Sequence, residues 1–398
     1  LRGAVRVGAL NGAAEVHLQA WGDRVVPAAD SVVLREGASG SGWRRVELAV
    51  RVPADRSIHS FVLMVGVRGR GAAWFDDFTL ERDGAVLAEL PSEVPPVSPA
   101  QRAWLAARTA PLTSLTSRAA NAGSRNTTRP RPALASDLAL VSRIVGNARL
   151  VGLGESTHGT HEFFVAKHRL LQHFVRELGF DVFAIEANQL AVETLNAFVS
   201  GGAGTAREAM QVLFRVWNTE EMLALVEWMR AYNAGHPRRP VRFIGYDMQD
   251  HRTPVDSLRA FVRRTEPQWE GRVRTLTEPY RVQPSFVMPN ASDSARGAWL
   301  SGAESLWLEV TGRHASWLAG ARTRDDTVAV EWAVHSADLV RQAARLNRSL
   351  NSPDRDSLMA ANLDWAMRTL YPTSRAVVWA HDVHVSHGGD RERSFNAG

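Results

Sequence analysis

Four short apolar runs in the second half of the chain constrain its fold more than any other feature. They read ARLVGLG, FDVFAI, VRFIGY and RAVVWA, and segments with apolar residues three and four apart separate them. Nearly continuous apolar runs are typical of parallel strands that are covered on both faces. The sequence therefore predicts a three-layer α/β fold with a mostly parallel sheet over residues 134–398.

Each of these runs leads into an ionisable residue, namely Glu155, Glu186, Asp247 and His381. In open α/β sheets, ligands bind outside the carboxyl ends of the strands. A polar residue that merely begins a loop would explain any one of these positions, but it is a weaker explanation for all four. The pattern therefore predicts a site at the carboxyl edge of the sheet, with Asp247 among the residues that bind the substrate.

The stretch GESTHGTHEFFVAKHRL at 154–170 contains the only lysine of the chain, beside 46 arginines elsewhere. A helix is predicted over 161–178, and its apolar stripe places Lys167 on the inward face. A buried ammonium is costly unless it meets a carboxylate. Glu155 and Glu186 are therefore the expected partners of Lys167.

Two pairs of residues suggest either a metal site or a proton-transfer site. Glu155 and His158 lie in a loop that is flanked by glycines, and His381 and His384 follow the last apolar run. Neither spacing is the H-E-x-x-H signature of zinc proteases. A divalent metal on these residues and a metal-free site with one histidine as general base both remain open. Ser156 does not lie in a G-x-S-x-G motif, so it is not predicted to be a nucleophile.

Residues 1–90 are predicted to form a small β-sandwich, because AEVHLQAW, RRVELAVRV, HSFVLMVGV and AAWFDDFTLE alternate in polarity between turn residues. This region resembles the jelly-roll modules that are appended to many secreted carbohydrate-active enzymes. Trp21, Trp43 and Trp74 are interpreted as core residues, with a sugar-stacking face as the alternative and a glycan as its partner. Residues 91–133 are predicted to be a linker, and 266–322 a helical insertion that caps the site.

Composition excludes several classes of function. The net charge is +5, and the sequence has no basic patch interleaved with aromatic residues. We therefore do not expect the protein to bind nucleic acid. No apolar run approaches the roughly 18–20 residues that a membrane-spanning helix needs. The absence of cysteine removes disulfides and thiolate chemistry. We expect export to the periplasm or outside the cell in preference to the cytoplasm.

From residue 134 to 398 the chain resembles the erythromycin esterase family, which includes macrolide esterases and succinoglycan-biosynthesis-type homologues. The matching stretches occur in family order and include VGLGESTHGTHEFFVAKHRL, RVWNTEEMLALVEWMRAYN, RDSLMAANLDWAM and VVWAHDVHVS. The resemblance implies hydrolysis of a small-molecule ester or lactone, without metal or other cofactor. It also implies a truncated C-terminus, because the family continues past the last stretch.

The resemblance implies a role for particular residues. His158 becomes the general base for water, supported by Glu155 or Glu186. Our hypothesis is that Lys167, with His381 or His384, stabilises the oxyanion or protonates the leaving alkoxide. His161 and Trp217 are further predicted substrate contacts.

Three alternatives to a metal-free macrolide esterase stay open. Macrolide esterases carry arginine where this chain has Lys167, which argues against macrolide specificity. A metal-dependent hydrolase would use the same Glu and His cluster. A catalytically inactive, polysaccharide-associated binding protein is the third alternative.

Overall fold

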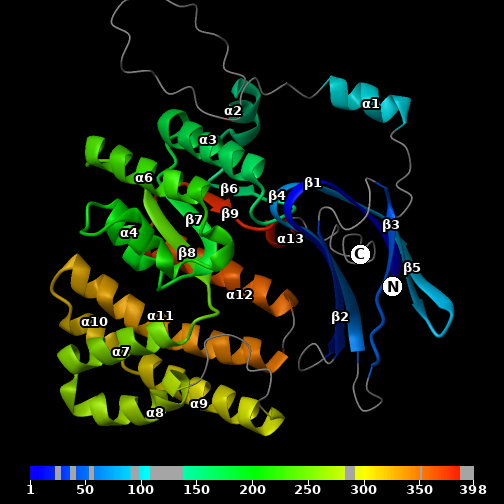
Figure 1. The fold of residues 1–398 in the computed structure, drawn as a ribbon. Helices are drawn as coiled ribbons and strands as arrows, with labels where there is room; N and C mark the ends of the chain where they lie inside the picture. The colour runs from blue at the N-terminus through cyan, green and yellow to red at the C-terminus, as the bar shows by residue number, and fades with distance from the viewer. Residues whose placement is uncertain are drawn as a thin grey trace, which may run out of the picture. The chain divides into compact units, whose positions relative to one another are not determined.

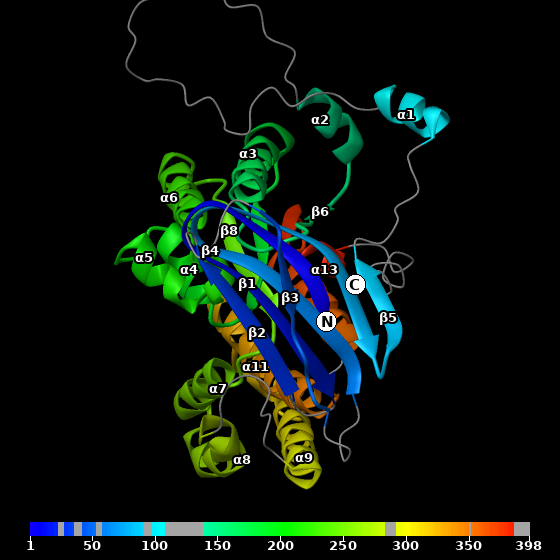
Figure 2. The same ribbon diagram turned by 45° about the vertical axis from the view of Figure 1, so that its right-hand side comes forward.

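The chain forms two compact units, seen in a computed structural model (Figures 1 and 2). The structure describes residues 1–22, 28–35, 42–52, 58–90, 98–107, 138–282, 292–349 and 352–385. The described part of the first unit lies in residues 1–107, and that of the second in 138–385. Of the predicted linker, residues 91–97 and 108–133 lie outside the described residues. Helix α1 (Pro99–Ala106) falls between them.

The first unit is an antiparallel sheet with strand order β2-β1-β4-β5, and β3 pairs with β1. The all-β prediction is therefore confirmed. Within the described residues the strands are joined into one hydrogen-bonded sheet, whereas a sandwich of two sheets was expected. The strands are β1 (Arg2–Gly22), β2 (Ala28–Arg35), β3 (Arg44–Glu47), β4 (Ile58–Arg82) and β5 (Ala85–Leu90).

The glycine-rich stretch between residues 67 and 72 does not form the turn that the sequence suggested. It is part of the single long strand β4, which contains both HSFVLMVGV and AAWFDDFTLE. Gly69 and Gly71 have φ values of +112° and +141°, and a Cβ on either would lie 2.1 Å from a backbone oxygen of β1. These glycines therefore allow β1 and β4 to approach closely where their register shifts, between Val7 and Leu10.

The core interpretation of the tryptophans is wrong for two of the three. Trp43 and Trp74 are 47% and 43% exposed. The guanidinium of Arg6 lies 4.2 Å from the ring centre of Trp74 and 5.3 Å from that of Trp43. The side chain of Trp21 lies outside the described residues. Smaller side chains fill the core instead: Val5, Leu10, Ala14, Val16, Leu18, Val46, Leu48 and Phe78.

The second unit contains the predicted parallel sheet, with strand order β6-β9-β7-β8. All four strands coincide with the four apolar runs. The two central strands are almost wholly buried, while the edge strand β6 is partly exposed. The strands are β6 (Leu150–Leu153), β7 (Val182–Asn188), β8 (Arg242–Asp247) and β9 (Ala376–Trp379).

Helices cover both faces of this sheet, which confirms the three layers (Figure 1). One core packs α3, α4 and α6 against one face, and the other packs α11, α12 and a π-helical turn against the opposite face. These elements are α3 (His161–Leu178), α4 (Glu193–Val199), α6 (Glu220–Gly235), α11 (Arg324–Ser349), α12 (Ser352–Trp365) and the turn η4 (Ala366–Leu370). Smaller elements are α2 (Ala139–Val145), α5 (Ala206–Ala209), η1 (Met210–Val212), η2 (Arg215–Trp217) and α13 (Asp382–Val385).

The helical insertion after β8 has a core of its own, built from residues such as Leu258, Trp269, Leu306 and Trp317 together with α11. Its elements are α7 (Arg252–Thr265), η3 (Pro267–Trp269), α8 (Glu270–Val282), α9 (Asp293–Thr311) and α10 (His314–Gly320). The helical prediction for 266–322 is confirmed where the structure describes it. Whether the insertion caps a site stays a prediction.

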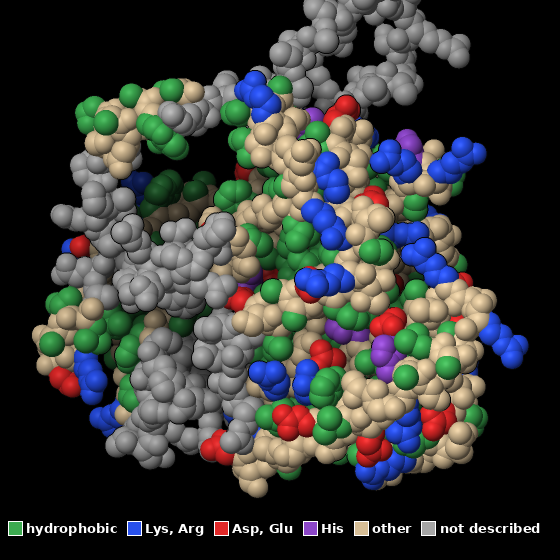
Figure 3. All heavy atoms as spheres, turned by 180° about the vertical axis from the view of Figure 1, so that it is seen from behind, with side chains coloured by type: hydrophobic (Ala, Val, Ile, Leu, Met, Phe, Trp, Pro, Cys, Tyr) green, Lys and Arg blue, Asp and Glu red, His purple; other side chains and the backbone are tan. Residues whose placement is uncertain are grey.

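The surface carries mixed charge. On the face shown in Figure 3, the coloured Lys and Arg side chains lie scattered among acidic and uncharged ones. None of the helices in the described ranges is long and apolar enough to cross a bilayer.

Candidate functional site

The carboxyl ends of the four parallel strands bring the predicted ionisable residues together. Glu155 follows β6, Glu186 lies near the end of β7, Asp247 ends β8, and His381 follows β9. Their side chains belong to two neighbouring networks, which we call the Glu155 cluster and the Glu186 cluster after the carboxylate at the centre of each.

The Glu155 cluster holds one buried carboxylate between three donors. Its members are Glu155, His158, Lys167 and Trp379. Nδ1 of His158 lies 2.8 Å from Oε1 of Glu155, and Nζ of Lys167 and Nε1 of Trp379 each donate to Oε2 at 2.9 Å. The side chain of Glu155 is 0% exposed and that of His158 is 29% exposed. With Nδ1–H directed at the carboxylate, the lone pair of Nε2 is free for chemistry.

Helix α3 positions the lysine of this cluster as expected. Phe164, Lys167, Leu171 and Phe174 are all buried and lie on one face of the helix. Nζ of Lys167 also lies 4.6 Å from the ring centre of Trp379, which is a cation–π distance. The ammonium group of Lys167 therefore has two partners, the ring of Trp379 and the carboxylate of Glu155.

Burial and pairing shift the pKa values of both partners. Burial lowers the pKa of Lys167 to about 8, although the hydrogen bond and charge of Glu155 oppose this shift. Burial alone would raise the pKa of Glu155. Hydrogen bonds from His158 and Lys167 outweigh that effect, so the pKa lies below its usual value. Glu155 is thus an ionised acceptor that can stabilise a charged His158.

The Glu186 cluster contains a residue that the sequence reasoning missed, Arg355 of α12. Its other members are Glu186, Asp247, Asp356 and His384. Nη2 of Arg355 donates to Oε1 of Glu186 at 2.7 Å and to Oδ2 of Asp247 at 2.5 Å, and Nη1 lies 3.0 Å from Nε2 of His384. Nδ1 of His384 donates in turn to Oδ1 of Asp356 at 2.5 Å. Burial alone would lower the pKa of Arg355, but Asp247 and Glu186 outweigh it and raise the pKa. The sequence did offer a signal for Arg355, because this residue begins RDSLMAANLDWAM, one of the stretches that carry the family resemblance.

His381 joins the two clusters. Its backbone N–H donates to Oε2 of Glu186 at 3.2 Å, and its ring centre lies 5.2 Å from that of His158. Its Nε2 lies 3.1 Å from the carbonyl oxygen of Ser156 and donates to it. One quarter of its side chain is exposed, so it stands at the rim beside His158.

The three predicted substrate contacts lie in different surroundings. Trp217 is 0% exposed, packs edge-on against His158 at 4.9 Å between ring centres, and donates to the carbonyl oxygen of Glu186 at 2.7 Å. Asp247 is also 0% exposed, and each of its oxygens accepts a hydrogen bond from the protein. Both side chains are enclosed by protein atoms here, and their role as substrate contacts stays a prediction. His161 is exposed and pairs with Glu221 at 2.6 Å, outside both clusters.

The charges of the clusters are paired within the protein. Glu155 faces Lys167, and Glu186 and Asp247 share Arg355. Among the residues that the structure describes, no group of three or more His, Asp or Glu side chains is arranged to hold a metal ion. The arrangement can accept a proton at His158 and stabilise the resulting imidazolium through Glu155.

Comparison with known proteins finds relatives that match part of this chain. The chain is 24% identical over 274 residues to "Putative hydrolase YbfO" of Bacillus subtilis (strain 168), a match that covers 63% of this chain and 59% of YbfO. It is 33% identical over 112 residues to "Erythromycin esterase type II" of Escherichia coli, covering 28% of this chain and 26% of that protein. The chain thus spans about 59% of the length of YbfO and a smaller share of the esterase.

Two crystal structures share the fold. A Bacillus cereus protein superposes with a TM-score of 0.59 at 24% identity, over 71% of this chain and 66% of its own. A succinoglycan biosynthesis protein superposes with a TM-score of 0.56 at 23% identity, over 73% of this chain and 71% of its own. The family model for erythromycin esterase matches residues 175–398, which is more than half of the sequence. The chain therefore belongs to the erythromycin esterase family.

Proposed function

We propose that this protein hydrolyses an ester or lactone bond of a small molecule, with His158 as the base that activates water. The observation that carries the proposal is the bond between Nδ1 of His158 and the buried Glu155, 2.8 Å long. This bond leaves Nε2 as the proton acceptor at the carboxyl edge of the sheet. Family membership and the similarity to a hydrolase support the same class of reaction.

In the proposed reaction, His158 transfers one proton from the attacking water to the leaving alkoxide. Nε2 of His158 takes a proton from water while the water oxygen attacks the carbonyl carbon, and the π electron pair moves to the carbonyl oxygen. When the tetrahedral intermediate collapses, its C–O bond breaks and the leaving alkoxide takes the proton from His158. Glu155 stabilises the imidazolium between these steps. A base positioned in this way contributes about 10²–10⁴-fold to the rate.

In this proposal Lys167 acts through Glu155. Its side chain is only 6% exposed and its Nζ is committed to the carboxylate and to the Trp379 ring, so it holds the acceptor in place. His381 is the more accessible group for stabilising the developing oxyanion, because it lies beside His158 at the rim. The proposal specifies the substrate only as an ester or lactone. Macrolides are one class of substrate to assay.

The experiment is a screen of ester and lactone substrates with the full chain, in the presence and absence of a chelator. Turnover that survives chelation and falls about 10²–10⁴-fold in His158→Ala supports the proposal. The matched control is His314→Ala, since His314 pairs with Glu331 in the helical insertion. Full activity of His158→Ala would overturn the proposed base. Activity lost to the chelator and restored by zinc or manganese would support the metal-dependent alternative.

A second function is proposed for the first unit alone. Trp43 and Trp74 expose nearly half of their surface around Arg6, which suits stacking against a sugar ring. Binding of the full chain to polysaccharide, weakened in Trp43→Ala/Trp74→Ala while ester turnover is retained, supports it. Equal retention of the wild type and the variant on the polysaccharide would contradict it.

A further inference from the structure

Two adjoining hollows lie at the opposite edge of the parallel sheet, where the strands begin. The smaller has a volume of about 560 Å³ and the larger about 900 Å³. Asp181, Arg238 and Arg239 line both hollows. Because Asp181 immediately precedes β7 and Arg242 begins β8, these hollows are separated from the His158 site by the length of the strands, roughly 13–23 Å.

The smaller hollow is lined by four arginines: Arg238, Arg239, Arg242 and Arg324. None of the four forms an ion pair within the part of the chain that the structure describes. Arg242 is oriented by a hydrogen bond from Nη1 to Oγ of Ser200 at 3.3 Å. Four like charges around one hollow repel one another unless an anion enters it.

The single carboxylate that lines the smaller hollow is already engaged. Oδ2 of Asp181 accepts from Oγ of Ser374, and Oδ1 accepts from the backbone N–H of Arg375, both at 3.0 Å. Glu193 lies near Arg242, but burial raises the pKa of Glu193 to about 7, so it is only partly ionised at neutral pH. The arginines therefore keep an excess of positive charge.

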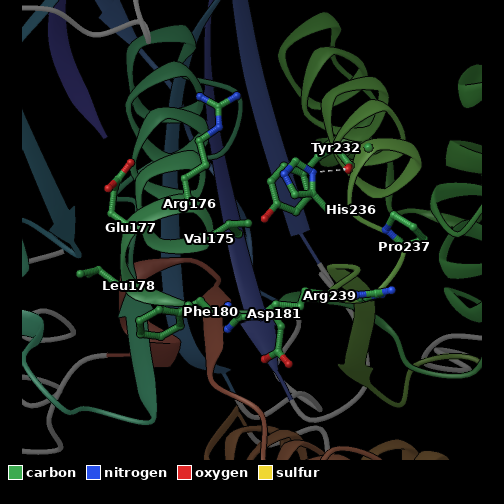
Figure 4. Close-up of a pocket in the computed structure, with 13 residues that line it drawn as sticks. Val175, Arg176, Glu177, Leu178, Phe180, Asp181, Tyr232, His236, Pro237 and Arg239 are labelled. Atoms are coloured by element: carbon green, nitrogen blue, oxygen red, sulfur yellow. Dashed lines mark hydrogen bonds between the residues drawn. The ribbon is translucent and has the colours of Figure 1, made fainter.

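The larger hollow adds a flat aromatic wall and a further cation (Figure 4). The ring of His236 stacks on Tyr232 at 4.0 Å between centres and 10° between planes. Figure 4 shows Arg176 projecting from α3 on the side opposite Arg239 and Asp181. The larger hollow has Arg176, Arg238 and Arg239 against Glu177 and Asp181, so the greater excess of positive charge belongs to the smaller hollow.

We propose that the smaller hollow binds a polyvalent oxyanion of the phosphate or sulfate type, such as a phosphoryl or sulfate group carried by a small molecule. Guanidinium groups present paired N–H donors that match the spacing of such oxygens, and these bonds are charge-assisted. Arg239 and Arg242 are the main ligands, because they come from the loop and the strand that frame the hollow. The site is separate from the hydrolytic residues and does not depend on the proposed reaction.

The test is calorimetric titration of the full chain with pyrophosphate, with sulfate, and with citrate at matched ionic strength. Saturable binding of pyrophosphate or sulfate that is tighter than binding of citrate supports the site. If pyrophosphate binds more tightly than sulfate, the natural ligand carries a phosphoryl group, and in the opposite case it carries a sulfate group. Arg239→Gln/Arg242→Gln should weaken that binding about tenfold or more. Arg264→Gln is the matched control, since Arg264 is an exposed arginine of α7, and it should stay within about twofold.

Two further variants keep the test decisive. If the double variant does not fold, Arg239→Gln alone replaces it, because this residue is exposed and its loss disturbs no core. His158→Ala should bind pyrophosphate like the wild type, so failure of the hydrolase proposal leaves this one standing. Absence of saturable binding, equal binding of citrate, or an equal loss in Arg264→Gln would overturn it.

Discussion

The two clusters at the carboxyl edge of the sheet use similar residues in different ways. In the Glu155 cluster one carboxylate receives three donors, and the histidine keeps one ring nitrogen for other partners. In the Glu186 cluster both ring nitrogens of His384 are engaged, by Arg355 and by Asp356. An open nitrogen permits proton transfer, whereas a closed network fixes the position of its members. We therefore assign chemistry to the first cluster and positioning to the second.

Arg355→Met should produce the largest loss of stability, because it leaves Glu186 and Asp247 buried without their shared cation. Removal of one partner from a buried ion pair costs about 3–5 kcal/mol. Urea unfolding monitored by circular dichroism measures this loss. The control is Arg207→Met, whose pair with Glu220 is exposed and is worth about 1 kcal/mol or less. Equal losses in the two variants would contradict a positioning role for Arg355.

Lys167→Arg should change how stability depends on pH. The folded-state pKa of Lys167 is about 8, below its ordinary value of 10.5, so the unfolded chain binds more protons between these values. The contribution of Lys167 to stability therefore rises with pH from about 8 to 10.5, and it is least favourable below 8. Arginine does not titrate in this range.

Unfolding free energies of the two proteins, measured from pH 7 to pH 10.5, test this. The wild type should gain stability relative to Lys167→Arg across that window. Parallel curves would mean that Lys167 titrates as an ordinary exposed lysine, contrary to its buried position next to Glu155.

His161→Ala should have the smallest effect, since the residue lies outside both clusters. The hydrogen bond with Glu221 raises the pKa of His161, so its stabilisation is present below the unfolded pKa of about 6.5 and disappears as pH rises past the folded pKa. A slightly lower melting temperature at pH 6 and unchanged ester turnover at pH 8 are expected. A loss of turnover would favour the substrate contact that the sequence suggested.

Local patterns predicted the part of the site that is close in sequence. Glu155, His158 and Lys167 lie within one strand–loop–helix unit, so strand ends and helix periodicity are sufficient to bring them together. Arg355 is separated from Glu186 by 169 positions, and nothing in the helical pattern of α12 indicates which strand end it faces. Its role depends on how the helix packs on the sheet, which a local pattern does not contain.

The same limit explains the errors in the first unit. Gly69 and Gly71 were expected in a turn, because glycine permits both positive φ in turns and close backbone approach between strands. Trp43 and Trp74 were expected in the core, because large aromatic residues usually lie there. Arg6 lies against both rings at the surface instead, and this contact can be predicted only when the pairing of β1 with β3 and β4 is known.

The most direct test of the central claim is a double-mutant cycle between Glu155 and His158. It compares kcat/KM on the best-cleaved ester for Glu155→Gln, His158→Ala and the combined variant, with unfolding curves to confirm that each protein folds. If Glu155 acts only through His158, the double variant should be no slower than His158→Ala. Losses that multiply would show that the two residues act independently and would contradict the proposed proton-transfer unit.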